Sequence, residues 1–201
     1  MGLRSWVTGL LGDGVEATED SEGRSPSVSR PQAGDAGDGQ LELAVDVERR
    51  AGSILEHYGL SGEDARQVAE ILSAELAREE GYARSMIADR VARELDMDAD
   101  RARTIVDTEV ASIRNLARVR KFTEQAGDEV RFRWIDSVGN DDSPVCADVR
   151  TAIDERGPVS LGELQSIIRE AAGEHPSGTP ERADDLVPHE QCRHTVVRHV
   201  E

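Results

Sequence analysis

The sequence predicts an α+β fold: a mostly helical N-terminal and middle part with a long helix, then a small antiparallel sheet in the C-terminal part. Apolar residues recur at helical spacing through residues 41–125. Only 3% of the residues are aromatic, so the core must be built from aliphatic side chains, which suits helices. Residues 130–138 alternate apolar and polar side chains, and a short apolar run lies near the end of the chain; both patterns indicate strands.

The first 40 residues are expected to lie outside this fold. Residues 1–12 form a short apolar segment, and residues 13–40 are rich in Gly, Asp, Glu, Ser and Pro, with almost nothing to bury. This composition predicts a disordered acidic tether. The apolar segment is either a plug that docks on a partner at the end of the tether or a frayed terminus.

Residues 41–97 predict a helical region. A first helix is expected from Leu41 to about Tyr58, where Gly59 ends it. Ser61 is placed to cap a second helix, with Asp64 three residues later. A third helix follows the break at Gly81. The apolar faces of the second and third helices are formed by Val68, Ile71, Leu72, Leu76, Met86, Ile87, Val91 and Leu95.

Residues 98–201 are expected to form the C-terminal domain. It opens with a helix over about 99–125, which would span about 40 Å and which Gly127 closes. The strand over 130–138 and a loop over 139–144 come next. A short helix from Cys146 to about Glu155 then leads to the next turn.

The last part of this domain contains a second capping signal. Ser160 and Glu163 predict a capping box that opens a helix through to Ala172. Residues 173–187 are expected to be a loop, and residues 193–200 a closing strand.

The chain of 201 residues is strongly acidic, with a formal net charge of -17 and a single lysine, Lys121. Such a charge weakens a compact state at low ionic strength, and salt screens it. Two sources fit this composition: the cytoplasm of a halophilic host, or a GC-rich genome in which arginine replaces lysine. Acid is in excess in nearly every segment, which favours the saline source.

No segment approaches the ~18 apolar residues of a membrane span, and the N-terminus lacks the apolar core of a secretory signal. Two cysteines are too few for a disulfide scaffold. We therefore expect no membrane contact, and a protein that is used in a cytoplasm or inside a particle assembled there.

The densest coordinating chemistry lies near the C-terminus. Cys192 and His194 are two residues apart, so on a strand they would face the same way. His189 lies three residues before Cys192, in a turn that Pro188 helps to set. Cys146, which follows its own proline-containing loop, is the expected fourth ligand. Two sulfurs and two imidazoles in a tetrahedral array suit structural Zn²⁺.

Two other interpretations stay open for these cysteines: a Cys146–Cys192 disulfide, or two unconnected thiols. Asp142 is a substitute ligand, although loop aspartates more often form turns. A nucleophilic Cys192 is disfavoured because no glycine-rich loop or helix start near it supplies oxyanion donors. We therefore expect no catalytic residues and a protein that is not an enzyme.

The long helix carries the only local excess of basic side chains. They are Arg101, Arg103, Arg114, Arg118, Arg120 and Lys121, continuing to Arg131 and Arg133. The interleaved acids Asp107, Glu109 and Glu124 favour a solvated helix face with ion pairs over a surface for DNA phosphates. His57, His175 and His199 have no companions and are expected at surface or boundary positions.

Three motifs occur in order from about Met86 onward. The long helix contains residues 101–110, R-A-R-T-I-V-D-T-E-V, with Asn115 further on, and a strand with Trp134 follows. Asp142 and Cys146 then lie in a loop. The terminal motif holds Pro188, His189, Cys192 and Arg193. In the order of these motifs the chain resembles the phage Mu F-like head morphogenesis proteins, with their R-A-x-x-I-A-R-T-E-V…N helix, D-x-x-T-C-x-x-C loop and P-x-H-x-N-C-R-C terminus.

Departures from the family pattern include four positions in the loop and the terminus. Val145 replaces the loop threonine, Val149 the second loop cysteine, Gln191 the usual asparagine, and His194 the last cysteine. The resemblance implies that any metal here is held by the cysteines and histidines that remain. These are Cys146, His189, Cys192 and His194, the same four that spacing suggests.

The resemblance implies a minor capsid or head morphogenesis protein of a tailed virus or provirus, here one of a halophilic host. Such a protein is expected to associate with portal protein or major capsid protein in the host cytoplasm during assembly. It would then lie in the capsid interior of the virion, in few copies, in contact with packaged DNA. The alternative is a small zinc-dependent nucleic-acid-binding module. A cysteine hydrolase is a third hypothesis.

Overall fold

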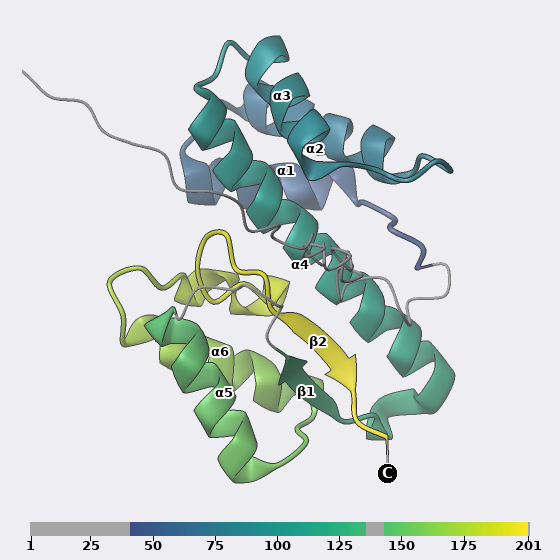
Figure 1. Cartoon of the computed structure of the whole chain (residues 1–201), viewed down its shortest axis with the longest axis vertical. Coiled ribbons are helices and arrows are strands. Elements are labelled where there is room, and N and C mark those ends of the chain that lie inside the picture. The colour runs from purple at the N-terminus through teal and green to yellow at the C-terminus, as the bar shows by residue number, and fades with distance from the viewer. Residues whose placement is uncertain (1–40, 136–142, 201) are drawn as a thin grey trace, which may run out of the picture. The chain divides into compact units, whose positions relative to one another are not determined.

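The computed structural model describes residues 41–135 and 143–200, all within a unit that spans residues 32–201. Figure 1 shows its elements. In chain order they are α1 (Val47–Tyr58), α2 (Gly62–Leu76), α3 (Arg84–Glu94), α4 (Ala99–Ala126), the 3-10 helix η1 (Gly127–Glu129), β1 (Phe132–Ile135), α5 (Pro144–Arg156), α6 (Leu161–Gly173), the 3-10 helix η2 (Pro180–Asp185) and β2 (Thr195–Arg198). The predicted tether, the plug and Asp142 lie outside the described residues.

The predicted fold class is confirmed. Helices dominate, and β1 and β2 form a two-stranded antiparallel sheet in the C-terminal part. Trp134 lies opposite Val196 in the register of this sheet. Among the described residues, no helix is both long enough and apolar enough to cross a membrane.

Capping residues place the helices where the sequence predicts them. The Ser61 hydroxyl accepts a hydrogen bond from the Asp64 N–H at 3.1 Å, and Asp98 caps α4 in the same way. The capping box between Ser160 and Glu163 is complete. Gly59 ends α1 with φ 60, a left-handed conformation that glycine adopts without strain.

The first helix begins later than predicted. Asp46 caps α1 by accepting a hydrogen bond from the Arg49 N–H, so residues 41–46 are not helical. Leu43 and Val45 nevertheless pack against the first core. Their apolar spacing therefore reflects partial burial of a non-helical segment rather than a helical turn.

The long helix α4 contributes to two apolar cores. Ile105 and Val106 belong to the core of α1–α4, whereas Val119 belongs to the core that α5, α6 and the sheet enclose. Figure 1 shows α4 running from the other N-terminal helices to the sheet. The predicted division of the chain at residue 98 stays a prediction. Helix α4 follows this position and packs into the apolar cores of both parts.

The C-terminal core surrounds the sheet. Phe132 and Trp134 are buried on one face of β1, as their alternation predicts. Phe132 also exchanges two backbone hydrogen bonds with Val159, at 2.7 and 3.0 Å, which ties the segment between α5 and α6 to the sheet.

Several predicted boundaries in this part are wrong, and the first strand begins at Phe132 rather than Val130. The closing strand is only Thr195–Arg198, so Cys192 and His194 precede it. The predicted loop 173–187 contains η2, which a proline opens. Helix α5 begins at Pro144 rather than Cys146, because proline is well tolerated in a first helical turn.

Candidate metal centre

Helix α5 holds Cys146 in its first turn. Ser143 is the residue before the helix, and Pro144 and Val145 precede the cysteine. Cys146 is buried, and Val149 lies one turn later on the same face in the same core. The α5 start therefore directs the Cys146 sulfur inward, toward the terminal segment.

The terminal segment is bent by a turn that α4 anchors. Gln191 has φ 57, a left-handed conformation that is uncommon outside glycine. Its backbone N–H donates to the Thr108 hydroxyl at 2.8 Å, and its side-chain amide donates to the Thr104 hydroxyl at 2.6 Å. This turn brings His189 and Cys192 to the same side of the segment.

Cys146, His189 and Cys192 converge on one point. Their ligand atoms all lie within 4.8 Å of one another. Cys146 Sγ is 3.0 Å from His189 Nε2 and 3.6 Å from Cys192 Sγ. In a regular tetrahedral zinc site these separations are about 3.5 Å for S···N and about 3.8 Å for S···S. A small opening of the cluster therefore gives the spacing of three zinc ligands.

The imidazole of His189 is oriented for coordination through Nε2. Its Nδ1 lies 2.7 Å from the Glu190 carbonyl oxygen, which can accept a hydrogen bond from Nδ1–H and so leave the Nε2 lone pair for a metal. Histidines that bind metal commonly donate their other N–H in this way. Burial lowers the pKa of His189, but its hydrogen bond and charge interaction with Cys192 outweigh burial and raise that pKa overall.

The two cysteines are free thiols in this structure and are buried, at 2% and 4% exposure. The hydrogen bond from Cys146 holds the pKa of the Cys192 thiol well below its usual range, against the opposing effect of burial. Thiolate is the form of cysteine that binds metal. Burial of both sulfurs favours a structural role over a nucleophilic one.

His194 lies beside the cluster rather than within it. Its Nδ1 is 3.5 Å from Cys192 Sγ, but among the described residues it does not belong to the set whose ligand atoms all converge. Its buried ring stacks on Trp134, with centroids 5.4 Å apart and planes at 13°. Asn115 of α4 fixes the backbone here by donating to the His194 carbonyl at 3.2 Å.

This arrangement ties distant segments together. The three converging residues come from α5 and from the turn before β2, which are about forty-five residues apart in the sequence. A metal ion with sulfur and imidazole ligands at this point would join the last strand to the helical part of its domain. The residues present fit such an ion, and its role would be structural.

Sequence reasoning missed a second buried polar site, which we call the charge network. Glu109 of α4 is fully buried and accepts from Arg50 at 2.7 Å and from Arg182 at 2.6 Å. Arg182 also donates to Asp185 at 3.2 Å. The prediction that Glu109 belongs to a solvated helix face is therefore wrong, because α1 and η2 cover this part of α4.

Asp185 is the second acid of the charge network. Its carboxylate accepts from Ser53 at 2.8 Å and from Arg49 at 3.1 Å. Burial raises the pKa of Asp185, but the charge of Arg50, the Ser53 hydroxyl and Arg182 lower it more, so the net pKa lies below its ordinary value. No sequence motif marks these residues, since they are common types that are far apart in the chain.

Two surface pockets lie near the charge network. One, of about 350 Å³, is lined by Ser53, His57, Glu181, Arg182 and other residues of α1 and η2. The Nδ1 atom of His57 lies 3.2 Å from a carboxylate oxygen of Glu181, so this half-buried histidine, predicted at a surface or boundary position without companions, does have one.

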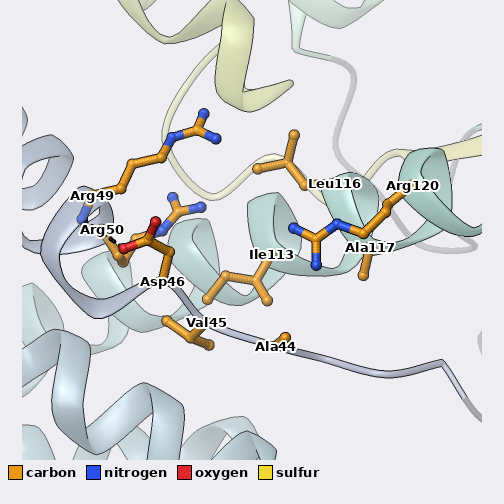
Figure 2. A pocket seen from close by; sticks show the side chains of 9 residues that line it. All are labelled: Ala44, Val45, Asp46, Arg49, Arg50, Ile113, Leu116, Ala117 and Arg120. Atoms are coloured by element: carbon orange, nitrogen blue, oxygen red, sulfur yellow. Dashed lines mark hydrogen bonds between the residues drawn. The ribbon is translucent and has the colours of Figure 1, made fainter.

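The other pocket, of about 40 Å³, lies between residues 44–46, the start of α1 and α4. Figure 2 shows Arg50 and Arg120 on its two sides, with Ile113 between them. This volume has room for a few water molecules.

Comparison of this chain with family models, with curated proteins and with solved structures finds no match in any of the three.

Proposed function

We propose that this chain is a head morphogenesis protein, a minor capsid protein of a tailed virus or provirus of a halophilic host. One observation carries the proposal. Two residues that match the family pattern in the long helix make hydrogen bonds to the terminal segment that holds the last motif, although about eighty positions separate the two segments. Thr108 and Asn115 are the residues on the helix side.

The contact at Thr108 explains the usual asparagine of the family terminus. Gln191 occupies that position and has the left-handed conformation, which asparagine adopts more readily than other residues with side chains. The Thr108 hydroxyl accepts the Gln191 N–H. A threonine in the helix and a residue that tolerates this conformation in the terminus are therefore parts of one local structure.

The contact at Asn115 has a matching role. Its side-chain amide donates to the His194 carbonyl, and its side-chain oxygen accepts from the Val196 N–H, both at 3.2 Å. One asparagine side chain thus satisfies two buried backbone groups at the start of β2. A shorter, aliphatic or charged side chain at this position would leave at least one of them unpaired.

In this proposal the candidate metal centre acts as a clamp that joins the start of α5 to the turn before β2, and its metal is zinc. Cys146, His189 and Cys192 supply two sulfurs and one imidazole, and His194 is the fourth ligand after a local adjustment of its ring. Sulfur and imidazole together select zinc over the hard cations magnesium and calcium. The clamp holds the C-terminal part in one conformation, and the helical part supplies the interaction surface.

The proposed partners are portal protein and major capsid protein, with few copies of this chain in the capsid interior. Residues 1–12 dock on one of these partners, and residues 13–40 tether the folded part to it. The net charge of -17 suits a protein that works in a saline cytoplasm.

The test is co-purification from the host. The tagged chain is expressed together with the other head genes, captured at molar salt, and its partners are identified by mass spectrometry after nuclease treatment. Retention of portal or capsid protein is expected, and a chain that begins at residue 41 should retain less. Capture of no head component would contradict the proposal.

The alternative is a small zinc-dependent nucleic-acid-binding module, which the same cysteines and histidines would suit. Exposed arginines on α4, among them Arg101, Arg103 and Arg120, supply local positive charge. The overall charge opposes this function, because DNA would be repelled. Tight DNA binding by the full chain, with an affinity that falls steeply as salt rises, would favour the alternative.

A further inference from the structure

We infer that Cys146 and Cys192 form a clamp with two exclusive states, a metal-bound dithiolate under reducing conditions and a disulfide under oxidising conditions. The first state rests on the proposed zinc centre. The second state does not, because it needs only the two sulfurs. In both states the same two segments, the start of α5 and the turn before β2, stay joined.

The distance between the two sulfurs suits both shared coordination of one metal ion and, after a small movement, a disulfide bond. They lie 3.6 Å apart, close to the about 3.8 Å that two ligands of one zinc ion adopt. A disulfide bond of about 2.05 Å needs them to approach by about 1.5 Å. Rotation of the Cys192 side chain and a small shift of its turn can supply this, because Cys192 lies outside any helix or strand.

Anchors on both sides of Cys192 preserve the approach when the metal leaves. Gln191 is held by Thr108, and the residues after Cys192 are held by Asn115. Cys146 is fixed by the first turn of α5. These anchors do not involve a metal, so they hold the two sulfurs as neighbours whether or not one is bound.

Closeness and burial favour the disulfide over other oxidation products. A sulfenic acid at either cysteine meets the other sulfur at once and condenses with it. Both side chains are buried, so a small oxidant such as hydrogen peroxide can reach them more readily than a bulky disulfide compound. The chain contains two cysteines in all, so an intramolecular disulfide has one identity.

The reaction balances with hydrogen peroxide as the two-electron oxidant. From the metal-bound state, two thiolates, one peroxide and two protons give one disulfide, one free Zn²⁺ and two waters. From the metal-free state, two thiols and one peroxide give one disulfide and two waters. The sulfurs lose two electrons, the peroxide O–O bond breaks, and the S–S bond forms.

The two states fit the life of a virion component. A reducing cytoplasm keeps thiols available for metal, whereas surroundings outside the cell favour disulfides. A particle that leaves the cell would exchange one clamp for the other. The closing strand would then stay attached even where free zinc is scarce.

The test uses the full chain, purified both with zinc and after chelation. Each form is treated with peroxide at molar salt, the remaining thiols are alkylated, and the intact mass is measured. We expect both alkylation sites to disappear, a mass lower by two hydrogens, and one zinc released per disulfide formed. A reductant should restore both thiols, and oxidised glutathione should react far more slowly than peroxide.

The outcomes separate this inference from the zinc proposal. Disulfide formation in a protein that never binds zinc would support the two sulfurs as an oxidisable pair and overturn the metal-bound state. Bound zinc with thiols that resist peroxide, or that gain oxygen atoms without pairing, would overturn the inference and leave the zinc centre intact. In Cys192→Ser, Cys146 should take up oxygen or alkylating reagent, with no loss of two hydrogens.

Discussion

The candidate metal centre, formed by Cys146, His189 and Cys192, and the charge network are both polar sites beside α4, yet only the first is visible in the sequence. The metal centre uses the only two cysteines of the chain and a histidine, and its terminal half is packed into a few residues. The charge network uses arginines and acids, and Arg50 and Arg182 are 59 and 73 positions from Glu109. Rarity and density reveal a site, whereas common residues at long range do not.

The two sites also stabilise the fold by different means. A metal adds strong bonds between ligands that could otherwise be neutral, so its removal leaves a cluster that relaxes to thiols and imidazole. The charge network has no neutral state at ordinary pH, because arginine stays protonated. Removing one partner there leaves buried charge without compensation. The charge network should therefore be the more sensitive of the two to substitution.

The largest effect is expected for Glu109→Ala, which leaves the two buried guanidinium groups of Arg50 and Arg182 with a single carboxylate, that of Asp185, between them. We expect a loss of about 3 to 5 kcal/mol in the free energy of unfolding. Urea denaturation at constant molar salt measures it. Glu124→Ala is the matched control, because Glu124 lies on the same helix and is exposed. A Glu109→Ala protein as stable as this control would contradict the charge network.

Metal removal should have the next largest effect. With free zinc about a hundredfold above its dissociation constant, binding adds about 3 kcal/mol to the stability of the folded state. Thermal unfolding with and without a chelator measures the difference. Cys192→Ser should unfold at a temperature that the chelator no longer changes. Equal chelator effects on both proteins would show that the cysteine is not a ligand.

The fold could be predicted because its signals are local. Capping residues such as Ser61, Asp98 and Ser160 act within three or four positions, and the apolar spacing of the long helix is set by its own geometry. The errors occur where contacts between distant segments determine the bounds of an element. Leu43 is partly buried against the core of α1–α4, and among the described residues the closing strand pairs with β1 at four positions.

The candidate site could be predicted in composition but not in arrangement. Rare ligand types identified Cys146, His189 and Cys192, which the structure brings together. The prediction that a strand would direct His194 toward the cluster is wrong, because β2 begins after His194, whose ring instead stacks on Trp134. The role of Glu109 required knowing that α1 and η2 meet over α4, which no local pattern encodes.

Asn115→Ala should have an intermediate effect on the free energy of unfolding. The Asn115 side chain connects α4 to the segment beside the candidate metal centre but is not one of its ligands. The change leaves the His194 carbonyl and the Val196 N–H unpaired, at a cost of about 2 kcal/mol. Amide exchange at Val196 should accelerate, and zinc should bind more weakly. Gln125→Ala, at an exposed position of the same helix, is the control. Unchanged exchange at Val196 would contradict this role.

A change of pH is expected to have a smaller effect on the free energy of unfolding. This effect tests the charge network independently of the candidate metal centre. The pKa of Asp185 is lower in the folded protein than its ordinary value of 3.8, as a net result of burial, which raises it, and Arg50, Ser53 and Arg182, which lower it. The Asp185 carboxylate therefore stabilises the fold above that value, and this contribution is lost as the pH falls through the folded pKa.

This pH dependence can be measured in metal-free protein, where zinc release does not interfere. The stability of the wild-type chain should fall as the pH decreases below about 4, and Asp185→Asn should flatten the curve. Asp184→Asn, at the exposed neighbouring position, should keep the wild-type slope. Parallel curves for the two variants would mean that Asp185 does not carry the effect.

The smallest effect is expected at an exposed ion pair in the same C-terminal part. Arg169 and Asp184 lie 2.9 Å apart, like the pairs of the charge network, but their side chains are 51% and 69% exposed. Water solvates both groups in the unfolded and folded states, so Arg169→Ala should cost less than about 0.5 kcal/mol. In molar salt, screening over about 3 Å should remove even that. Equal losses for Arg169→Ala and Glu109→Ala would mean that burial is not what distinguishes the two kinds of pair.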